Sequence, residues 1–178
     1  LSEPVSFDEL KQHLRIEHDV ENALLQRYIS AAREYSEEMI YYKLCKQRWV
    51  VSFDGFSKNL HLEIAPMISV DSVQYYDEDD ALQTLPTTVY QVNDYLVNSV
   101  ISLKANQSWP TTKEAMVNSV LVNCTVGIKQ PKHTHKHAIL LIAAAWYKNR
   151  EDFVALDLKP IPHGAKALLG LYENQVFA

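Results

Sequence analysis

The chain has 178 residues, of which 47% are hydrophobic and 22% are charged. This balance is typical of a folded protein rather than a disordered one, and the length fits one domain or one domain with an inserted subdomain. Seventeen basic and 22 acidic residues give a net charge of -5, which disfavours a surface that binds nucleic acid or anionic membranes as a whole, although a local basic patch stays compatible with it. Only four glycines argue against phosphate-cradling loops.

The first 42 residues predict two helices. Ser6-Phe-Asp-Glu9 has the spacing of a capping box, and apolar residues at helical intervals then predict a short helix that ends near Ile16. A longer amphipathic helix is predicted from Asp19 to about Tyr42. Its charged residues are expected on the solvated side, away from the apolar stripe: Arg27, Arg33, Glu34, Glu37 and Glu38.

The period of the apolar residues changes from 3.6 to 2 at Lys46, which predicts strands. Residues 49–53 and 60–64 alternate on either side of Asp54-Gly55 and predict a hairpin. Further strands are predicted at 68–76, 89–93, 95–97, 100–103 and 116–126. The acidic run 77–80 lacks the spaced ligands and central glycine of an EF-hand loop and predicts a solvated turn. Residues 46–127 are therefore expected to form a small antiparallel β subdomain.

A strongly apolar helix is predicted between Pro131 and Arg150. Apolar residues fill nearly every position from Ala138 to Trp146, which indicates burial on all sides, and the run is too short to span a bilayer. We expect this helix to form the core of the fold through Ile139, Ile142 and Trp146. A last helix is predicted at 163–174. The resulting fold class is α+β: a helical bundle formed by residues 1–45 and 128–178, with the β subdomain inserted between them.

Residues with reactive side chains do not assemble into a recognisable catalytic pattern. Cys45 and Cys124 lie in apolar stretches and are expected to be buried thiols, although a disulfide stays open. No nucleophile elbow, phosphate-binding loop or dinucleotide fingerprint is found. We therefore predict that the protein is not an enzyme and uses no cofactor. The sequence also shows no signal peptide, so a reducing cytoplasm is the expected site of synthesis.

A basic run precedes the apolar helix. His133, His135 and His137 could bind zinc if the segment were extended, but on a helix their side chains point in different directions, so no metal site is predicted. Cations are disfavoured at the start of a helix, which favours an acidic partner for this run. Its members are Lys129, Lys132, His133, His135 and Lys136.

The chain ends in an apolar tail. Gln175, Val176, Phe177 and Ala178 carry no side-chain charge. An exposed Val-Phe pair costs free energy in water, so the tail is expected to fold back or to dock on another protein.

The order of several motifs resembles that of tailed-phage head–tail connector (adaptor) proteins, in particular the longer members with a β insertion. The segments that carry the resemblance occur in the same order over nearly the whole chain. They are residues 4–15, Trp49, the break at residues 64–66, the strand at 70–76, Trp109-Pro110, the helix at 138–151 and the segment 162–172.

The resemblance implies a structural role in the virion. Such proteins form a ring, usually a dodecamer, beneath the portal protein at the head–tail junction, and they are assembled in the host cytoplasm. The ring extends the DNA channel, lets DNA pass without sequence-specific binding, and presents a surface to a neck or tail completion protein. The C-terminal segment, here residues 175–178, commonly engages the portal. No membrane is involved.

The sequence leaves two alternatives to a connector function open. A DNA-packaging accessory protein would contact nucleic acid through the basic stretch from Lys129 to Lys136. A metal-dependent enzyme would require zinc at His133, His135 and His137.

Overall fold

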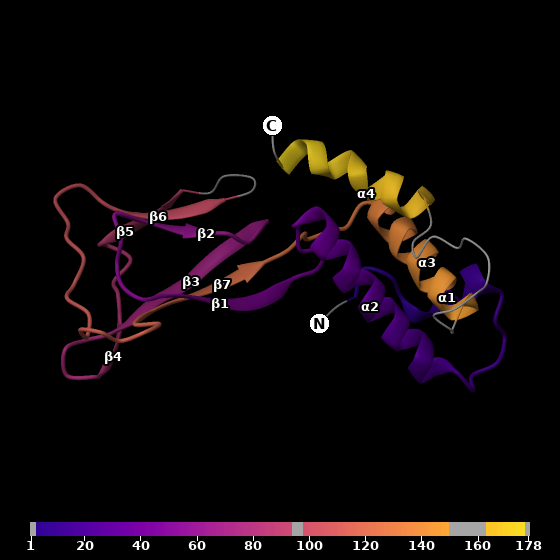
Figure 1. Ribbon diagram of the computed structural model, residues 1–178, viewed down its shortest axis with the longest axis horizontal. Helices are drawn as coiled ribbons and strands as arrows, with labels where there is room; N and C mark the ends of the chain where they lie inside the picture. Colours follow the sequence, from indigo (N-terminus) through magenta and orange to yellow (C-terminus); the bar gives the residue numbers. More distant parts are fainter. Residues whose placement is uncertain (1–2, 94–97, 150–162, 177–178) are drawn as a thin grey trace. The chain divides into compact units, whose positions relative to one another are not determined.

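The structure is a computed structural model that describes residues 3–93, 98–149 and 163–176, with residues 171–176 in backbone only. It has the expected α+β fold class, and its elements are drawn in Figure 1. In chain order they are α1 (Phe7–Leu14), α2 (Asn22–Ile40), β1 (Gln47–Phe53), β2 (Asn59–Leu62), β3 (Met67–Tyr76), β4 (Leu82–Thr84), β5 (Tyr90–Asn93), β6 (Ser99–Leu103), β7 (Val120–Val126), α3 (His133–Lys148) and α4 (His163–Val176).

The chain divides into two compact units. The helical unit comprises residues 1–45 and 129–178, and the β unit comprises residues 46–128. Each unit has buried apolar residues of its own, and each is described separately below. No helix in the described part of the chain combines the length and the apolar character that crossing a bilayer would need.

The capping box at the start of α1 is confirmed. The Ser6 hydroxyl accepts a hydrogen bond from the Glu9 amide (3.1 Å), and the Ser6 amide donates to the Glu9 carboxylate (2.7 Å). Val5 and Leu10, which occupy the positions of a hydrophobic staple, are both buried. The helix ends before the predicted Ile16 because Arg15 adopts a left-handed conformation, with φ of 59°.

Helix α2 is long and amphipathic, as predicted, but it begins at Asn22 rather than at Asp19. The Asp19 carboxylate accepts hydrogen bonds from the Asn22 side chain (3.2 Å) and from Lys11 Nζ (2.8 Å), so it holds the turn before the helix. Tyr41, with φ of 52°, ends the helix. Its buried apolar face carries Leu25, Ile29, Ala32 and Ile40.

Helix α3 contacts α1, α2 and α4. Ile139 and Ile142 are fully buried, whereas Trp146 is half-buried with its ring centre 5.9 Å from that of Tyr35. The predicted burial on all sides is wrong, because Leu140 and Leu141 are only half-buried. The helix begins at His133, after Lys132 at the N-cap, and not at Pro131. In α4, Ala165 and Leu169 are buried.

The described strands of the β unit form two antiparallel sheets, with strand orders β1-β7-β3-β4 and β2-β6-β5. The predicted hairpin between residues 49–53 and 60–64 is therefore wrong: β1 pairs with β7, from Gln47–Val126 to Phe53–Val120, and β2 pairs with β6. Asp54 gives the physical reason. Its carboxylate accepts from the Asn118 amide and its carbonyl from the Ser119 hydroxyl (both 2.9 Å), which ties the turn to β7.

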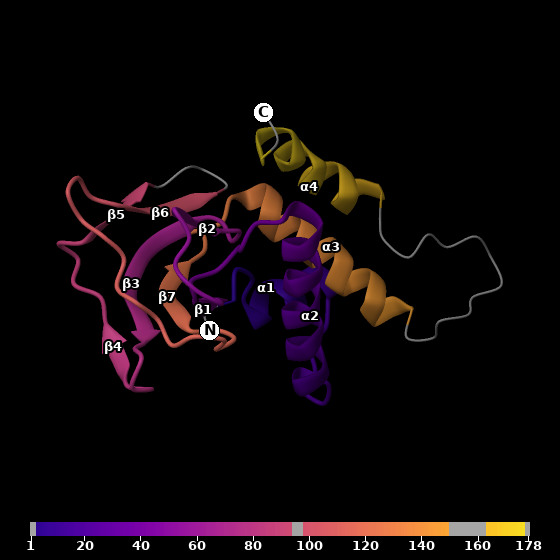
Figure 2. The same cartoon turned by 60° about the vertical axis from the view of Figure 1, so that its left-hand side comes forward.

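Strands β3, β5, β6 and β7 follow the predictions with shifted ends, whereas β4 was not predicted. Strand β7 begins at Val120 rather than at Met116, because Ala115 and Asn118 have positive φ angles of 57°. Strand β3 bends at two irregularities in its pairing with β7, and Figure 2 shows the resulting curvature. The strand predicted at 95–97 lies outside the described residues.

Apolar side chains of both sheets form the core of the β unit. Leu60, Leu62 and Ile101 come from one sheet, and Val73 and Val122 come from the other. The loop residue Trp109 closes this core, because its ring stacks on that of Phe56 at 4.7 Å between centres.

Cys45 in the helical unit and Cys124 in the β unit are both buried free thiols, as expected.

Candidate functional site

A buried network of charged side chains lies in the helical unit, where sequence reasoning expected a solvated surface. Arg33 is 5% exposed and Glu37 is 2% exposed. The guanidinium of Arg33 binds Glu37 through Nη1 (3.0 Å), Glu3 through Nε (2.8 Å) and the exposed Glu34 through Nη2 (3.0 Å). Burial alone would lower the pKa of Arg33, but the hydrogen bond to Glu3 and the charge of Glu37 outweigh it and raise that pKa.

Glu37 connects this network to the point at which the chain leaves the helical unit. Its second carboxylate oxygen accepts a hydrogen bond from the Leu44 amide (2.8 Å) and lies 3.9 Å from the Cys45 sulfur. Lys43 Nζ lies 3.9 Å from the other oxygen. One carboxylate therefore holds both α2 and the segment that leads to β1.

The spacing along α2 contains a signal for this burial. Arg33 and Glu37 follow Ile29 in steps of four, and Ile40 follows three residues later, so all four lie on one helix face. The prediction that Arg33 and Glu37 are solvated is wrong. An Arg–Glu pair at this spacing neutralises its own charge, so it can be buried with the apolar stripe. The prediction of a solvated side chain holds for Glu38, which is exposed.

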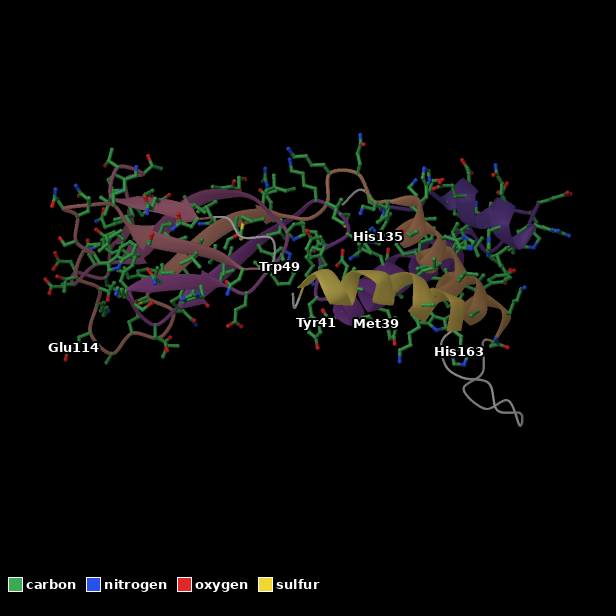
Figure 3. The ribbon with its side chains drawn as sticks, turned by 90° about the horizontal axis from the view of Figure 1, so that it is seen from above. Met39, Tyr41, Trp49, Glu114, His135 and His163 are labelled. Carbon is green, nitrogen blue, oxygen red and sulfur yellow. The ribbon has the colours of Figure 1, made fainter. Side chains whose placement is uncertain are left out.

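The basic run before α3 does not form one continuous surface. His135, labelled on α3 in Figure 3, is 1% exposed, so it is not available to a partner at the surface of the unit. Burial and the nearby charge of Lys132 lower the pKa of His135 to about 4, so the ring is neutral at pH 7. Lys136 Nζ pairs with Glu9 (3.2 Å). The exposed members of the run are Lys129, Lys132 and His133.

The three histidines of this run do not converge. His133 and His137 are exposed, whereas His135, between them, is buried. The His137 ring meets that of His13 edge to face, with centres 6.2 Å apart. Within residues 3–93, 98–149 and 163–176, no group of three potential ligands lies close enough to hold a metal ion.

In the β unit, a groove of about 560 Å³ runs beside β1. One wall consists of five consecutive residues, Trp49 to Phe53, and the other contains His61, Glu63 and Ile64. Because alternate side chains of a strand point to opposite faces, a groove lined by consecutive residues follows the edge of the strand. Within this wall Val50 is 58% exposed, and Trp49, labelled in Figure 3, is also exposed.

The acidic turn between β3 and β4 is held in shape by Asp77. Its carboxylate accepts hydrogen bonds from the amides of Ala81 (2.9 Å) and Asp79 (3.1 Å) and from the Gln83 side chain (2.7 Å), and these bonds lower the pKa of Asp77. Asp80 pairs with Lys113 (2.8 Å). The turn is solvated, as predicted, and its fixed backbone presents Glu78 and Asp79 to solvent.

The C-terminal residues singled out in the sequence fall at the limit of the structure. Gln175 and Val176 end helix α4, where the backbone alone is described, and Phe177 and Ala178 lie outside the described residues.

Comparison with known proteins gives a family match. The family model described as "Phage gp6-like head-tail connector protein" matches residues 5–169. No curated protein matches the chain.

Solved structures of gene transfer agent (GTA) particles share the fold. A chain of the neck of an empty GTA particle, computed with C6 symmetry, has a TM-score of 0.77 and 19% identity, over 95% of this chain and 89% of that one. A chain of the native GTA virion has a TM-score of 0.74 and 20% identity over the same shares. A chain of the native neck, computed with C12 symmetry, has a TM-score of 0.70 and 19% identity, over 94% and 90%.

Replacing Glu37 by Gln should destabilise the helical unit strongly. The amide keeps the shape and can still accept from Leu44, but it removes the negative charge from a buried guanidinium, which costs about 2–3 kcal/mol. Urea unfolding followed by circular dichroism measures the loss. The matched control is Glu34→Gln, because that side chain is 67% exposed and its pair contributes about 0.5 kcal/mol or less. Equal effects of the two variants would show that the buried pair contributes no more than the exposed one.

Acidification should destabilise the helical unit through His135. The folded state holds the ring neutral with a pKa of about 4, whereas the unfolded chain protonates it near the ordinary value of 6.5. Stability is therefore lost as the pH falls from about 6.5 towards 4, by roughly 3 kcal/mol over the whole window. Urea midpoints at several pH values should fall less steeply for His135→Met than for the unchanged protein. If the urea midpoints of both proteins fell equally with pH, His135 would have the same pKa in the folded and unfolded states.

Proposed function

Because the chain belongs to the phage gp6-like head–tail connector protein family, we propose that it is a structural subunit of the connector ring of a phage or prophage particle. The observation that carries this proposal is the family match over residues 5–169, which spans both units. The family and the structural neighbours are structural components of particles and not enzymes. The virion, at the head–tail junction, is the proposed location, after assembly in the host cytoplasm.

A ring is the proposed assembly, with twelve subunits. Support comes from the neighbouring folds, which belong to neck structures computed with C6 and C12 symmetry. A closed ring needs head-to-tail contacts in which two different patches of each subunit meet.

We further propose that the two units have different roles in the connector. Residues 1–45 and 128–178 would act as one helical bundle around α3, and the β subdomain, residues 46–127, would supply assembly surfaces. The contacts of α3 with α1, α2 and α4, and the buried charge network, support a rigid helical frame. The separate core of the β unit supports its treatment as a subdomain.

The proposed partners are the portal protein, a neck or tail completion protein and DNA in transit. Residues 175–178 are the proposed portal contact, because burying Val176 and Phe177 in a partner removes apolar surface from water. The net charge of -5 supports a channel through which DNA slides without sequence-specific binding.

A DNA-packaging accessory that binds nucleic acid through residues 129–136 is the weaker candidate. Two of the five residues proposed for that contact are not available as surface cations. His135 is buried and neutral, and Lys136 is paired with Glu9. Strong salt-dependent retention of the purified protein on DNA, lost in Lys129→Glu/Lys132→Glu, would favour this candidate over the connector.

The proposed function predicts rings that negative-stain electron microscopy can detect. The purified protein should form ring-sized particles alone or on addition of its portal protein, with the portal present at one end of each complex. Monomers that persist at all concentrations, with and without the portal, would contradict the connector role.

Removing residues 175–178 should leave the fold intact and impair portal docking, because the apolar tail is the proposed contact. Co-sedimentation with the portal measures docking, and circular dichroism checks the fold. Val176→Asp/Phe177→Asp should reproduce the loss, whereas Gln175→Ala should dock normally. Normal docking of the truncated chain would remove the tail from the portal contact and leave the ring assignment untouched.

A further inference from the structure

The four-stranded sheet of the β unit carries two exposed patches of opposite charge at its two edges. Within the described residues, the strand order β1-β7-β3-β4 makes β1 one edge and β4 the other. Two neighbouring strands separate the edges, so one copy can use both at once. This arrangement is what a head-to-tail contact requires, and the inference drawn from it rests on the proposed ring.

The β1 edge combines an exposed apolar centre with positive charge. Val50 is 58% exposed, and it follows the exposed cations Lys46 and Arg48. The groove of about 560 Å³ runs along the same strand from Trp49 to Phe53, so an apolar side chain or an extended segment of another molecule can approach the strand edge there.

The β4 edge combines an exposed apolar centre with negative charge. Leu82 is 47% exposed, and all three residues of β4 face solvent. Glu78 and Asp79 lie beside it in the turn that Asp77 holds in shape. A preformed turn loses little conformational freedom on docking, which favours binding.

We propose that the β3–β4 turn and β4 of one copy dock on the β1 edge of the next copy in the ring. Leu82 then covers Val50 beside the groove, and Glu78 and Asp79 approach Lys46 and Arg48. The two edges are complementary: an apolar residue meets an apolar residue, and a positive edge meets a negative turn. Two edge strands brought together in this way also shield each other from unwanted pairing.

Other charged groups also lie near the two edges. Asp71 lies near Lys46 and Arg48; its carboxylate accepts hydrogen bonds from Ser69 (2.6 Å) and Thr125 (2.9 Å), which lower its pKa, so it keeps its negative charge and offsets part of the positive charge of this edge. At the other edge, Lys113 pairs with Asp80. Glu63 and His61 lie in the far wall of the groove. The proposed contact places the two cations of the β1 edge, rather than these acids, opposite the two acids of the turn.

Charge reversal on either edge tests the proposal. Lys46→Glu/Arg48→Glu places acids opposite acids, and Glu78→Lys/Asp79→Lys places bases opposite bases. Each variant alone should stay monomeric under conditions in which the unchanged protein forms rings, with its portal if the portal is needed. An equimolar mixture of the two should recover ring-sized particles in which the variants alternate, because every contact is again between opposite charges. Size-exclusion chromatography and negative-stain images provide the readout.

A control variant and the possible outcomes distinguish a failure of the proposed contact from a failure of the proposed ring. Arg27→Glu/Lys166→Glu makes the same change of net charge as Lys46→Glu/Arg48→Glu, but on exposed residues of the helical unit, and should leave ring formation unchanged. Circular dichroism verifies that each variant is folded. Rings from either variant alone, or no recovery in the mixture, would overturn the proposed contact and leave the ring standing. Absence of rings from the unchanged protein with its portal would overturn the proposed function and this contact with it.

Discussion

The helical unit depends on one guanidinium held between carboxylates. Arg33 joins Glu3, near the start of the chain, to Glu37 on α2, and Glu37 in turn holds the amide of Leu44. A buried ion pair adds little net stability over a well-packed apolar core, because both charges lose their hydration. It does disfavour alternative packings of these segments, because any packing that separates the charged partners leaves a charge buried without its partner. The network therefore defines how the N-terminal segment, α2 and the segment leading to β1 fit together.

Local features of the fold could be predicted from the sequence, and non-local ones could not. The capping box at Ser6 and Glu9 and the helical period of α2 are properties of neighbouring residues, and they appear in the structure close to where they were predicted. The hairpin after β1 failed because strand pairing depends on partners far along the chain. Nothing within residues 46–64 indicates that Asp54 binds Asn118 and Ser119.

The candidate site was predicted less completely, because burial of polar groups depends on tertiary contacts. Arg33, Glu37 and His135 read as surface residues in sequence, since charged and polar types are mostly exposed. Their burial follows from partners such as Glu3 and from packing within the helical unit. The family, in contrast, could be recognised from the order of its motifs, which no single periodicity contains.

The pairing of β1 with β7 also determines when the chain can fold during synthesis. Gln47 pairs with Val126, so the central sheet cannot close until the ribosome has made nearly the whole β unit. The contacts of helices α1 and α2 with α3 likewise cannot form until α3, which follows β7 in the chain, has been made. Contacts between residues so distant along the chain are slow to form, and an early product exposes β1 with its apolar edge to other nascent chains. Completion of β7 therefore covers one edge of β1 that an unfinished chain leaves open.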